Sequence, residues 1–241
     1  MTGFGISDKG PCRSENQDRF ALALEGPASL AVLCDGMGGA AAGALAAQKA
    51  VDGFLLHAEK CLREPELLPG ETVLRESAEY ANICVCDHAR RNPDCAGMGC
   101  TLVAVHARGE TVTVANVGDS RCYLYSAGTL RQITRDHSLV EELIASGQLR
   151  REEAANHPRR NIITRALGQS YTLRCDTFTL TAKEGDRLLL CSDGVSNALG
   201  DAAISAILAR EADCEGACRG LIALSLSRNA ADNVTAVVLQ P

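Results

Sequence analysis

The sequence predicts an α+β domain built in layers, with β-sheets inside and α-helices outside. Two long helical stretches come early, short β-branched or aromatic runs separated by glycines fill the middle, and two helices and a strand close the chain. Helices and sheets each have an apolar face to cover, and this order of elements favours sheets packed between helical layers. With 241 residues, 46% of them hydrophobic, we expect one domain spanning residues 1–241.

The helices are predicted from alanine-rich composition and helical spacing of apolar residues, and the strands from short β-branched runs. Helices are expected at 40–62, 71–91, 139–146, 202–209 and 215–228. Strands are expected at 4–7, 19–25, within 29–39, at 101–106, 111–117, 121–125, 129–133 and 173–180, within 187–197, and at 234–239. The close spacing of the four runs between residues 101 and 133 favours antiparallel pairing.

Residues 136–165 differ from their surroundings. The segment is charged, lacks strand signals and contains Gly147 and Pro158, so we expect an irregular insertion around the short helix. A long polar connection in a compact domain is usually functional or mobile. Its histidines, His137 and His157, are expected to be solvated rather than catalytic.

Charge and hydropathy exclude two classes of partner. A net charge of −6 and a pI near 5.4 argue against sequence-independent nucleic-acid binding, because that binding needs a basic face. No stretch approaches the roughly twenty apolar residues that a membrane span needs, and the N-terminus lacks the basic-then-apolar order of a signal peptide. We therefore expect a cytoplasmic protein with no nucleic acid and no membrane insertion.

Twelve cysteines need an explanation, since in a secreted chain they would suggest disulfides. Several, such as Cys34, Cys100 and Cys191, lie inside apparent strands, where a thiol behaves as a small buried hydrophobe. The chain has no CxxC pair, and no histidine lies at zinc-finger spacing from the closely spaced cysteines. We expect neither a structural zinc nor a disulfide framework.

Aspartates recur at the ends of apparent strands. Asp35 ends the run SLAVLCD and Asp193 ends RLLLCSD, each followed by glycine, and Asp119 lies in ANVGDSR. Asp18 directly precedes a strand, and Asp232 and Asn233 precede the last strand. Taken singly, an Asp-Gly pair is as well explained by a tight turn. Their repetition favours a shared acidic site.

Carboxylates, carbonyls and water are the ligands that Mg²⁺ and Mn²⁺ prefer. Such ions polarise phosphoryl oxygens, and a bridging pair can present hydroxide to phosphorus in line with the leaving group. Arg13, in the polar segment DKGPCRSENQD, could hold a phosphate through its planar fork of donors, although an ordinary solvated loop is the better explanation of this segment taken alone. The residues alone therefore leave a metal-dependent phosphohydrolase as one of several open interpretations.

Eight segments in order resemble the metal-dependent protein serine/threonine phosphatases, the PPM or type 2C family, in their compact bacterial form. They are RSENQD, LCDGMGG, MGCTLV, ANVGDSR, TRDHS, NIITRALG, LCSDGVSN and ADNVTAVVL. The resemblance covers essentially the whole chain. It implies a four-layer αββα sandwich, two antiparallel β-sheets flanked by pairs of antiparallel helices, with the metal centre at one end. Residues 136–165 would then be the flap beside the site, which in this family influences substrate choice.

The resemblance also implies a set of metal ligands. Asp35 would bridge two Mn²⁺ or Mg²⁺ ions, and the carbonyl of Gly36 would bind the second ion. Asp193 and Asp232 would complete the first. Asp119 matches the aspartate that helps to bind a third, weaker ion in bacterial members.

Other residues correspond to positions that act on substrate and water. Arg13 would contact the substrate phosphate, and Asp18 would hold metal-bound water. Three positions depart from the usual pattern, since Gln17 and Ala44 stand where many relatives have glutamate, and Ala40 stands where bacterial relatives usually have histidine. Because that histidine is the family's candidate general acid, we expect p-nitrophenyl phosphate to be cleaved better than phosphopeptides.

The implied function is hydrolysis of phosphoserine and phosphothreonine, and of aryl phosphates, by a monomer acting on phosphorylated protein substrates of a serine/threonine kinase. The alternative is a weak or inactive member that serves as a phosphoprotein-binding regulatory module. Retention of Arg13, Asp35, Asp193 and Asp232 favours the enzyme, since a chain freed from catalysis need not keep all four. A sensor-fused signalling phosphatase is disfavoured, because 241 residues leave no room for another domain.

Overall fold

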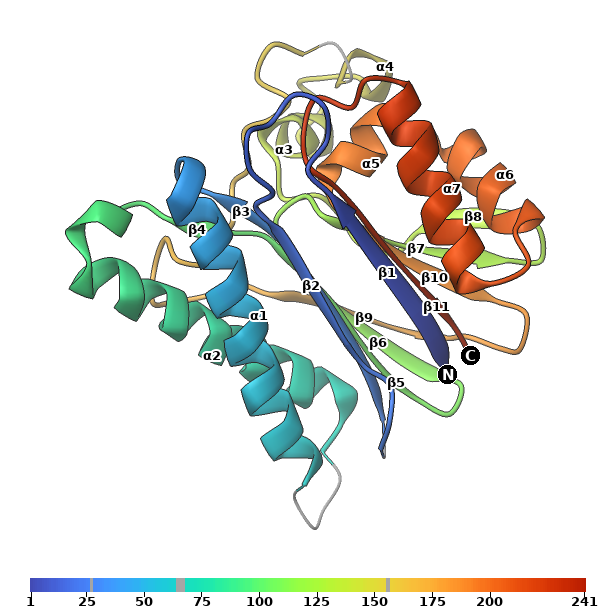
Figure 1. Cartoon of the computed structure of the whole chain (residues 1–241), viewed down its shortest axis with the longest axis horizontal. Helices are drawn as coiled ribbons and strands as arrows, with labels where there is room; N and C mark the ends of the chain where they lie inside the picture. The colour runs from blue at the N-terminus through green and yellow to red at the C-terminus, as the bar shows by residue number, and fades with distance from the viewer. Residues whose placement is uncertain (27, 64–67, 155–156) are drawn as a thin grey trace.

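Two antiparallel β-sheets pack face to face between two layers of helices (Figure 1). The computed structural model describes residues 1–26, 28–63, 68–154 and 157–241. One sheet has the strand order β1-β11-β10-β7-β8, and the other has β2-β3-β5-β6-β9 with the short β4 beside β3. This arrangement confirms the predicted α+β class and its four layers.

The strands are β1 (Thr2–Asp8), β2 (Asp18–Ala23), β3 (Ser29–Met37), β4 (Gly99–Cys100), β5 (Leu102–Arg108), β6 (Thr111–Val117), β7 (Arg121–Ser126), β8 (Thr129–Gln132), β9 (Asp176–Thr181), β10 (Arg187–Cys191) and β11 (Val234–Gln240). The helices are α1 (Ala40–Leu62), α2 (Gly70–Arg91), the 3₁₀ turn η1 (Pro93–Cys95), α3 (Leu139–Ala145), α4 (Arg151–Ala154), α5 (Asp193–Ala198), α6 (Asp201–Arg210) and α7 (Cys214–Ser227). Helices α1 and α2 cover the sheet that contains β3, whereas α5, α6 and α7 cover the sheet that contains β11 (Figure 1).

Three apolar layers hold the sandwich together. Successive side chains of a strand point to opposite faces, so in β3 Leu33 packs between the sheets and Cys34 packs toward α1 and α2. Leu190 joins the layer between the sheets, Phe54 joins the layer under α1 and α2, and Leu221 joins the layer under α7. Burial on both faces explains why the core strands are continuous apolar runs rather than alternating ones.

The turn after β3 determines where α1 begins. Gly38 and Gly39 have positive φ angles of 122° and 83°, in the region that favours glycine. The alanine-rich segment that follows starts α1 at Ala40, as predicted, and the side chains of Ala40 and Ala41 lie outside the described part. The glycine turn therefore places the beginning of a long helix directly beside the end of β3.

Some sequence predictions need correction, although the four runs between residues 101 and 133 do pair antiparallel, as expected. They belong to two sheets, because β5 pairs with β6 in one sheet and β7 pairs with β8 in the other. The chain crosses between the sheets at Gly118 and Asp119. Strand β9 begins at Asp176 rather than at residue 173. Helix α2 begins at Gly70, directly after Pro69 and one residue before the predicted start.

Two short helices were not predicted. The strand expected within 187–197 ends at Cys191, and Asp193 begins α5; the insertion contains α4 in addition to α3. The segment DGVSN offers little apolar periodicity, and its helical turn forms because it packs against β11 and α7. Within the described ranges, none of the helices combines the length and the apolarity that crossing a membrane requires.

The layer between the sheets should dominate the stability of the fold. Leu190 is completely buried there. Leu190→Ala is expected to lower the free energy of unfolding by about 2–5 kcal/mol, because it removes apolar contacts and leaves a cavity. Leu56, which is 62% exposed on α1, provides the control, and Leu56→Ala should change stability by no more than about 0.5 kcal/mol. Urea unfolding followed by circular dichroism measures both, and equal effects would contradict the assigned core.

Candidate metal centre

The predicted site residues converge at one end of the sandwich. A cavity of about 420 Å³ opens there between the two sheets and the flap. Among the residues lining it are six of the predicted site residues, Arg13, Asp35, Gly36, Asp119, Asp193 and Asp232. The seventh, Asp18, lies behind the cavity in β2.

Asp18 and Asp35 are direct neighbours across the β2–β3 ladder. Asp18 is only 1% exposed, and its Oδ2 accepts hydrogen bonds from the hydroxyls of Ser192, at 2.7 Å, and Thr235, at 2.6 Å. Thr235 lies in β11 of the other sheet, and Ser192 lies directly after β10 of that sheet. Asp18 therefore links the two sheets directly beneath the cavity, and sequence analysis missed both of its partners.

Asp193 owes its position to close backbone packing. It is the first residue of α5, and its Oδ2 accepts a hydrogen bond from Asn197 Nδ2 at 3.1 Å. A side chain at Gly194 would collide with the backbone carbonyl oxygen of Asn233. Only glycine therefore lets the start of α5 approach the segment that carries Asp232.

Asp119 reaches the cavity from the crossing between β6 and β7. Gly118, with φ 105°, makes this turn. The adjacent Ser120 hydroxyl lies 2.7 Å from Thr101 Oγ1, which accepts a hydrogen bond from the Asp35 backbone N–H at 3.0 Å. Thr101 and Ser120, two small residues that no motif singled out, thus fix the Asp119 turn relative to Asp35.

His137 is buried and hydrogen-bonded, which corrects the prediction of a solvated residue. It is 5% exposed, and its Nδ1 accepts a hydrogen bond from the backbone N–H of Gly118 at 3.1 Å. Its Nε2 lies 3.1 Å from Asp176 Oδ2, and Arg165 donates to the other oxygen of Asp176 at 2.8 Å. Because Nδ1 accepts, Nε2 carries the proton. Burial lowers the pKa of His137, so this neutral imidazole anchors the base of the flap to the Asp119 turn.

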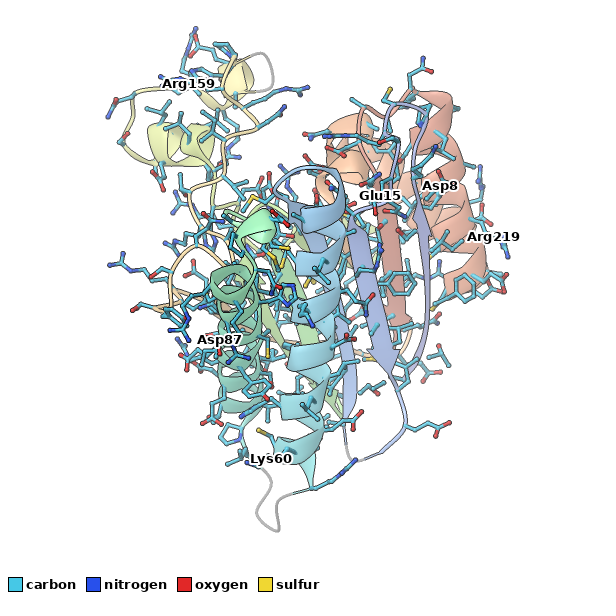
Figure 2. All side chains as sticks on the ribbon, turned by 60° about the vertical axis from the view of Figure 1, so that its left-hand side comes forward. Asp8, Glu15, Lys60, Asp87, Arg159 and Arg219 are labelled. Atoms are coloured by element: carbon cyan, nitrogen blue, oxygen red, sulfur yellow. The ribbon has the colours of Figure 1, made fainter. Side chains whose placement is uncertain are left out.

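The flap reaches the cavity with its second half. Asn161 and Ile163 line the cavity, whereas residues 155–156 lie outside the described part. Arg159 stands at the same end of the molecule as Glu15, which also lines the cavity (Figure 2). Part of the segment 136–165 therefore lies beside the cavity.

Arg13 forms an ion pair at the mouth of the cavity. Its Nη2 donates to Asp232 Oδ2 at 2.6 Å, and about half of the Arg13 side chain is exposed. The hydrogen bond to Asp232 is the main cause that raises the pKa of Arg13, so the guanidinium stays charged. A permanent positive charge therefore lies at the mouth of the cavity.

Asn233 holds the loop that carries Arg13. Its Nδ2 donates to the carbonyl oxygens of Lys9 and Glu15 at 2.8 and 2.9 Å, and its Oδ1 accepts from the backbone N–H of Gln17 at 2.9 Å. In the sequence, Asn233 stands out only as a residue at the boundary of the last strand. Its place directly after Asp232 in ADNVT was the signal available, since an asparagine amide can satisfy several loop backbone groups at once.

Burial and mutual repulsion disfavour the charged forms of these carboxyl groups. Burial, followed by the carboxylates of Asp119 and Asp232, raises the pKa of Asp193 to about 8. Burial likewise raises the pKa of Asp18 and of Asp119 to about 6. The pKa of Asp35 rises well above its usual range because of burial and the neighbouring Asp18. A positive charge bound in the cavity would therefore stabilise the ionised carboxylates.

Two carboxylate oxygens are also left without hydrogen bonds. Among the residues that the structure describes, Oδ1 of Asp18 and Oδ1 of Asp193 are buried and have no hydrogen-bond partner. An unsatisfied buried polar atom is costly, and an unsatisfied charged one more so. All-oxygen ligands, unsatisfied oxygens and excess negative charge together fit a site for hard divalent cations.

Comparisons with known proteins agree with this geometry. A family model described as protein phosphatase 2C matches residues 13–226. The serine/threonine phosphatase Stp of Listeria welshimeri is 36% identical over 97% of this chain and 93% of its own length. The crystal structure of the Mycobacterium tuberculosis phosphatase PstP/Ppp superposes with a TM-score of 0.88, at 34% identity over 98% of this chain and 97% of that one.

A further structure, the catalytic domain of the phosphatase PstP in complex with two manganese ions, has a TM-score of 0.85 and 33% identity over 98% of this chain and 96% of that one. Its similarity extends across both sheets and their helical layers. The sequence match, the sandwich and the acidic cavity all lead to one assignment. The chain belongs to the protein phosphatase 2C family.

Proposed function

We propose that this protein is a metal-dependent phosphatase that hydrolyses phosphoserine and phosphothreonine in proteins, and also aryl phosphates. The observation that carries the proposal is the convergence of Asp35, Asp119, Asp193 and Asp232 on one cavity with the guanidinium of Arg13 at its mouth. Membership of the protein phosphatase 2C family and the serine/threonine phosphatases among its relatives support it.

The cavity carboxylates are the proposed metal ligands. Asp35, the carbonyl of Gly36, Asp193 and Asp232 would hold two Mn²⁺ or Mg²⁺ ions, and Asp119 would help to hold a third, weaker ion. The unsatisfied Oδ1 of Asp193 and the raised pKa values support this role, as do the two manganese ions named for the related PstP structure. When bound, the ions would polarise the phosphoryl oxygens and lower the pKa of coordinated water.

Asp18 and Arg13 are the proposed catalytic residues. Ser192 and Thr235 hold Oδ2 of Asp18, so its Oδ1 would accept a hydrogen bond from the attacking water and orient it. A guanidinium has five N–H donors, and the contact with Asp232 uses one of them. The others would bind non-bridging oxygens of the phosphate and stabilise the charge that develops on them.

The site lacks the histidine that would protonate the leaving group. The family's usual histidine is replaced by Ala40, at the first position of α1. The nearby His137 is committed to Gly118 and Asp176 and does not line the cavity. We therefore propose that substrates with good leaving groups, such as aryl phosphates, are hydrolysed faster than phosphoserine peptides.

The biological setting extends the proposal. Phosphorylated substrates of a serine/threonine kinase are the proposed partners, and residues 1–241 would act as one catalytic domain with the flap at 136–165.

A cytoplasmic location is supported by the twelve cysteines, which are all thiols, since reducing compartments keep thiols reduced. The monomeric state stays a prediction that size-exclusion chromatography with light scattering can test.

Replacing one metal ligand tests the enzyme assignment. Asp193→Asn should lower Mn²⁺-dependent hydrolysis of p-nitrophenyl phosphate at least about 10²-fold, the typical cost of losing one electrostatic stabiliser. Asp201→Asn is the matched control, because Asp201 is also the first residue of a helix but is exposed. If metal-loaded protein has no activity that Asp193→Asn removes, the chain is a phosphoprotein-binding module instead.

Restoring a histidine tests the missing general acid. Ala40→His should raise turnover of a phosphoserine peptide by up to about 10²-fold, within the range that general acids contribute. Turnover of p-nitrophenyl phosphate should change much less, because its leaving group needs no proton. Steady-state kinetics with both substrates measures this, and wild-type peptide turnover equal to that of the variant would refute the argument.

The raised pKa values predict how pH affects the metal-free protein. Folded Asp18, Asp119 and Asp193 keep protons up to pH about 6–8, whereas in the unfolded chain they lose them near pH 4. The folded state thus binds more protons in this window, so metal-free stability should fall as pH rises from 5 to 8. The lowered pKa values of His106 and His137 act in the opposite direction, but these are two groups against the three aspartates.

Saturating Mn²⁺ should reverse this trend, because metal binding requires the deprotonated carboxylates. The difference in Tm between Mn²⁺-loaded and EDTA-treated protein should therefore grow steadily from pH 5 to pH 8. Circular dichroism melts at matched ionic strength measure the difference, from which the contribution of His137 cancels. A difference that is constant across this range would mean that the carboxyl groups do not titrate with the metal.

A further inference from the structure

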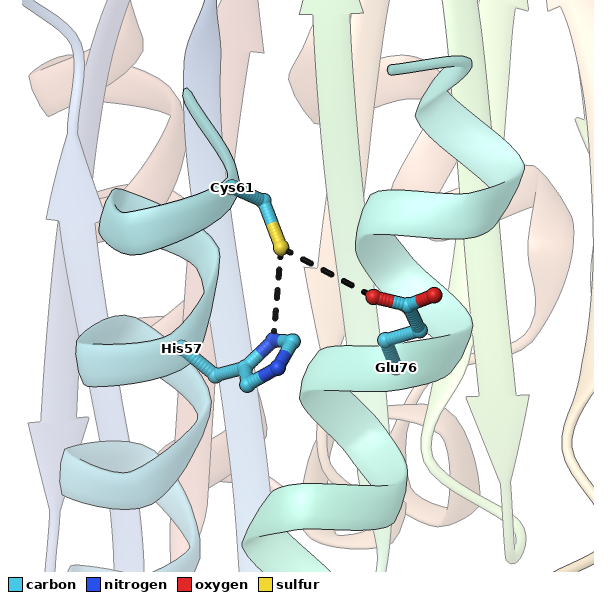
Figure 3. A group of neighbouring side chains, drawn as sticks. All are labelled: His57, Cys61 and Glu76. Carbon is cyan, nitrogen blue, oxygen red and sulfur yellow. Dashed lines mark hydrogen bonds between the residues drawn. The ribbon is translucent and has the colours of Figure 1, made fainter. Parts of the chain in front are cut away.

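A second group of metal-ligating side chains lies at the opposite end of α1 from the phosphatase centre. His57 and Cys61 project from α1 toward Glu76 on α2 (Figure 3). At 1.5 Å per residue, this group is about 25–30 Å along α1 from Ala40. Lys60, its neighbour in the chain, and Glu15, at the cavity, accordingly stand at opposite ends of the molecule (Figure 2).

The three ligand atoms are already close together. Cys61 Sγ lies 3.4 Å from His57 Nδ1 and 4.0 Å from Glu76 Oε2, and one ligand atom from each residue lies within 4.8 Å of the other two. In a tetrahedral zinc site with ordinary bond lengths, such atoms are roughly 3.3–3.6 Å apart. Small side-chain adjustments would therefore bring all three onto one ion without movement of either helix.

The surroundings hold these side chains in place and leave a path from solvent. Cys61 is 5% exposed, and the half-buried ring of His57 packs on Tyr80 with a centroid separation of 5.4 Å. The hydroxyl of Ser77 lies 3.4 Å from His57 Nδ1 on the buried side. Glu76 is exposed at the rim, so a metal ion can approach from that side.

The donor set selects a different ion from the one the phosphatase centre would hold. Thiolate and imidazole ligands suit Zn²⁺, whereas the oxygen-only cavity suits Mn²⁺ or Mg²⁺. One thiolate, one carboxylate and a neutral imidazole carry two negative charges, which balance a dication. Three protein ligands leave one tetrahedral position for water.

We propose that His57, Cys61 and Glu76 form a Zn²⁺ site that clamps α1 to α2. The Cys61 thiol would lose its proton to solvent when the ion binds. A zinc ion bound here would overturn the sequence-based expectation that the cysteines hold no structural zinc. The spacing of His57 and Cys61, four residues apart on one helix face, was a signal in the sequence, but the third ligand becomes visible only when α2 is packed beside α1.

Cobalt spectroscopy of the full chain tests the proposal. The phosphatase centre is first filled with Mn²⁺, and Co²⁺ is then titrated as a probe for zinc. The expected result is a thiolate-to-cobalt charge-transfer band with the intense visible bands of tetrahedral Co²⁺, bleached by Zn²⁺. The oxygen-only centre cannot produce the thiolate band, so Co²⁺ bound there does not interfere.

Two variants and a control locate the site. Cys61→Ser should abolish the thiolate band, and Glu76→Gln, at an exposed position that does not threaten folding, should weaken Zn²⁺ binding at least about tenfold. Cys84→Ser is the control, because Cys84 also faces α1, near Gly53, but lies outside the group, and it should leave the band unchanged. A wild type without the band, a band that survives Cys61→Ser, or undiminished Zn²⁺ affinity in Glu76→Gln would overturn the proposal.

Thermal unfolding provides an independent measurement. With Mn²⁺ present, Zn²⁺ at about 100 times its dissociation constant should raise the Tm of the wild type by roughly 5–10 °C. Glu76→Gln should show a clearly smaller rise and Cys84→Ser the full one. An equal rise in wild type and Glu76→Gln would mean that Zn²⁺ stabilises the protein elsewhere, which would also overturn the site.

Discussion

Repulsion among carboxyl groups removed from water is the constraint on which this structure depends. Asp18, Asp35, Asp119 and Asp193 come from separate segments, yet burial and their neighbours raise the pKa of every one. A fold selected only for stability would not gather such groups, because each tenfold change in the proton affinity of a carboxylate corresponds to about 1.4 kcal/mol of free energy. The cations proposed for the cavity would offset the desolvation cost and relieve the repulsion, so folding and metal binding would be coupled at this end of the sandwich.

A network of neutral polar groups keeps the acidic site assembled. Ser192 and Thr235 hold Asp18 from the opposite sheet, and Thr101 holds the backbone of Asp35 beside the Asp119 turn. Asn233 joins the loop of Arg13 to the end of the sandwich through three backbone groups. Neutral donors satisfy buried groups without adding charge, so they can position the carboxylates and leave their remaining oxygens available for metal ions.

Helix α1 connects two sites of opposite chemical character. It begins at the glycine turn after Asp35 and ends beside α2, where His57, Cys61 and Glu76 meet. At the first end only oxygen ligands are present, and at the second sulfur and nitrogen join a single carboxylate. Hard and borderline-soft ions are separated by such ligand sets, so the protein would keep its proposed catalytic and structural metals apart without relying on affinity alone.

The order and type of most elements followed from the sequence, because helical spacing, apolar runs and glycine turns are local properties. The range of α1 was predicted to the residue, and the aspartates beside apolar runs indicated an acidic site. The short helix at Asp193 and the burial of His137 were decided by tertiary structure, since both depend on groups far away in the chain. Sequence pattern shows what each residue can do locally, but only the packing of the two sheets decides which donors reach each carboxylate and which ligands share an ion.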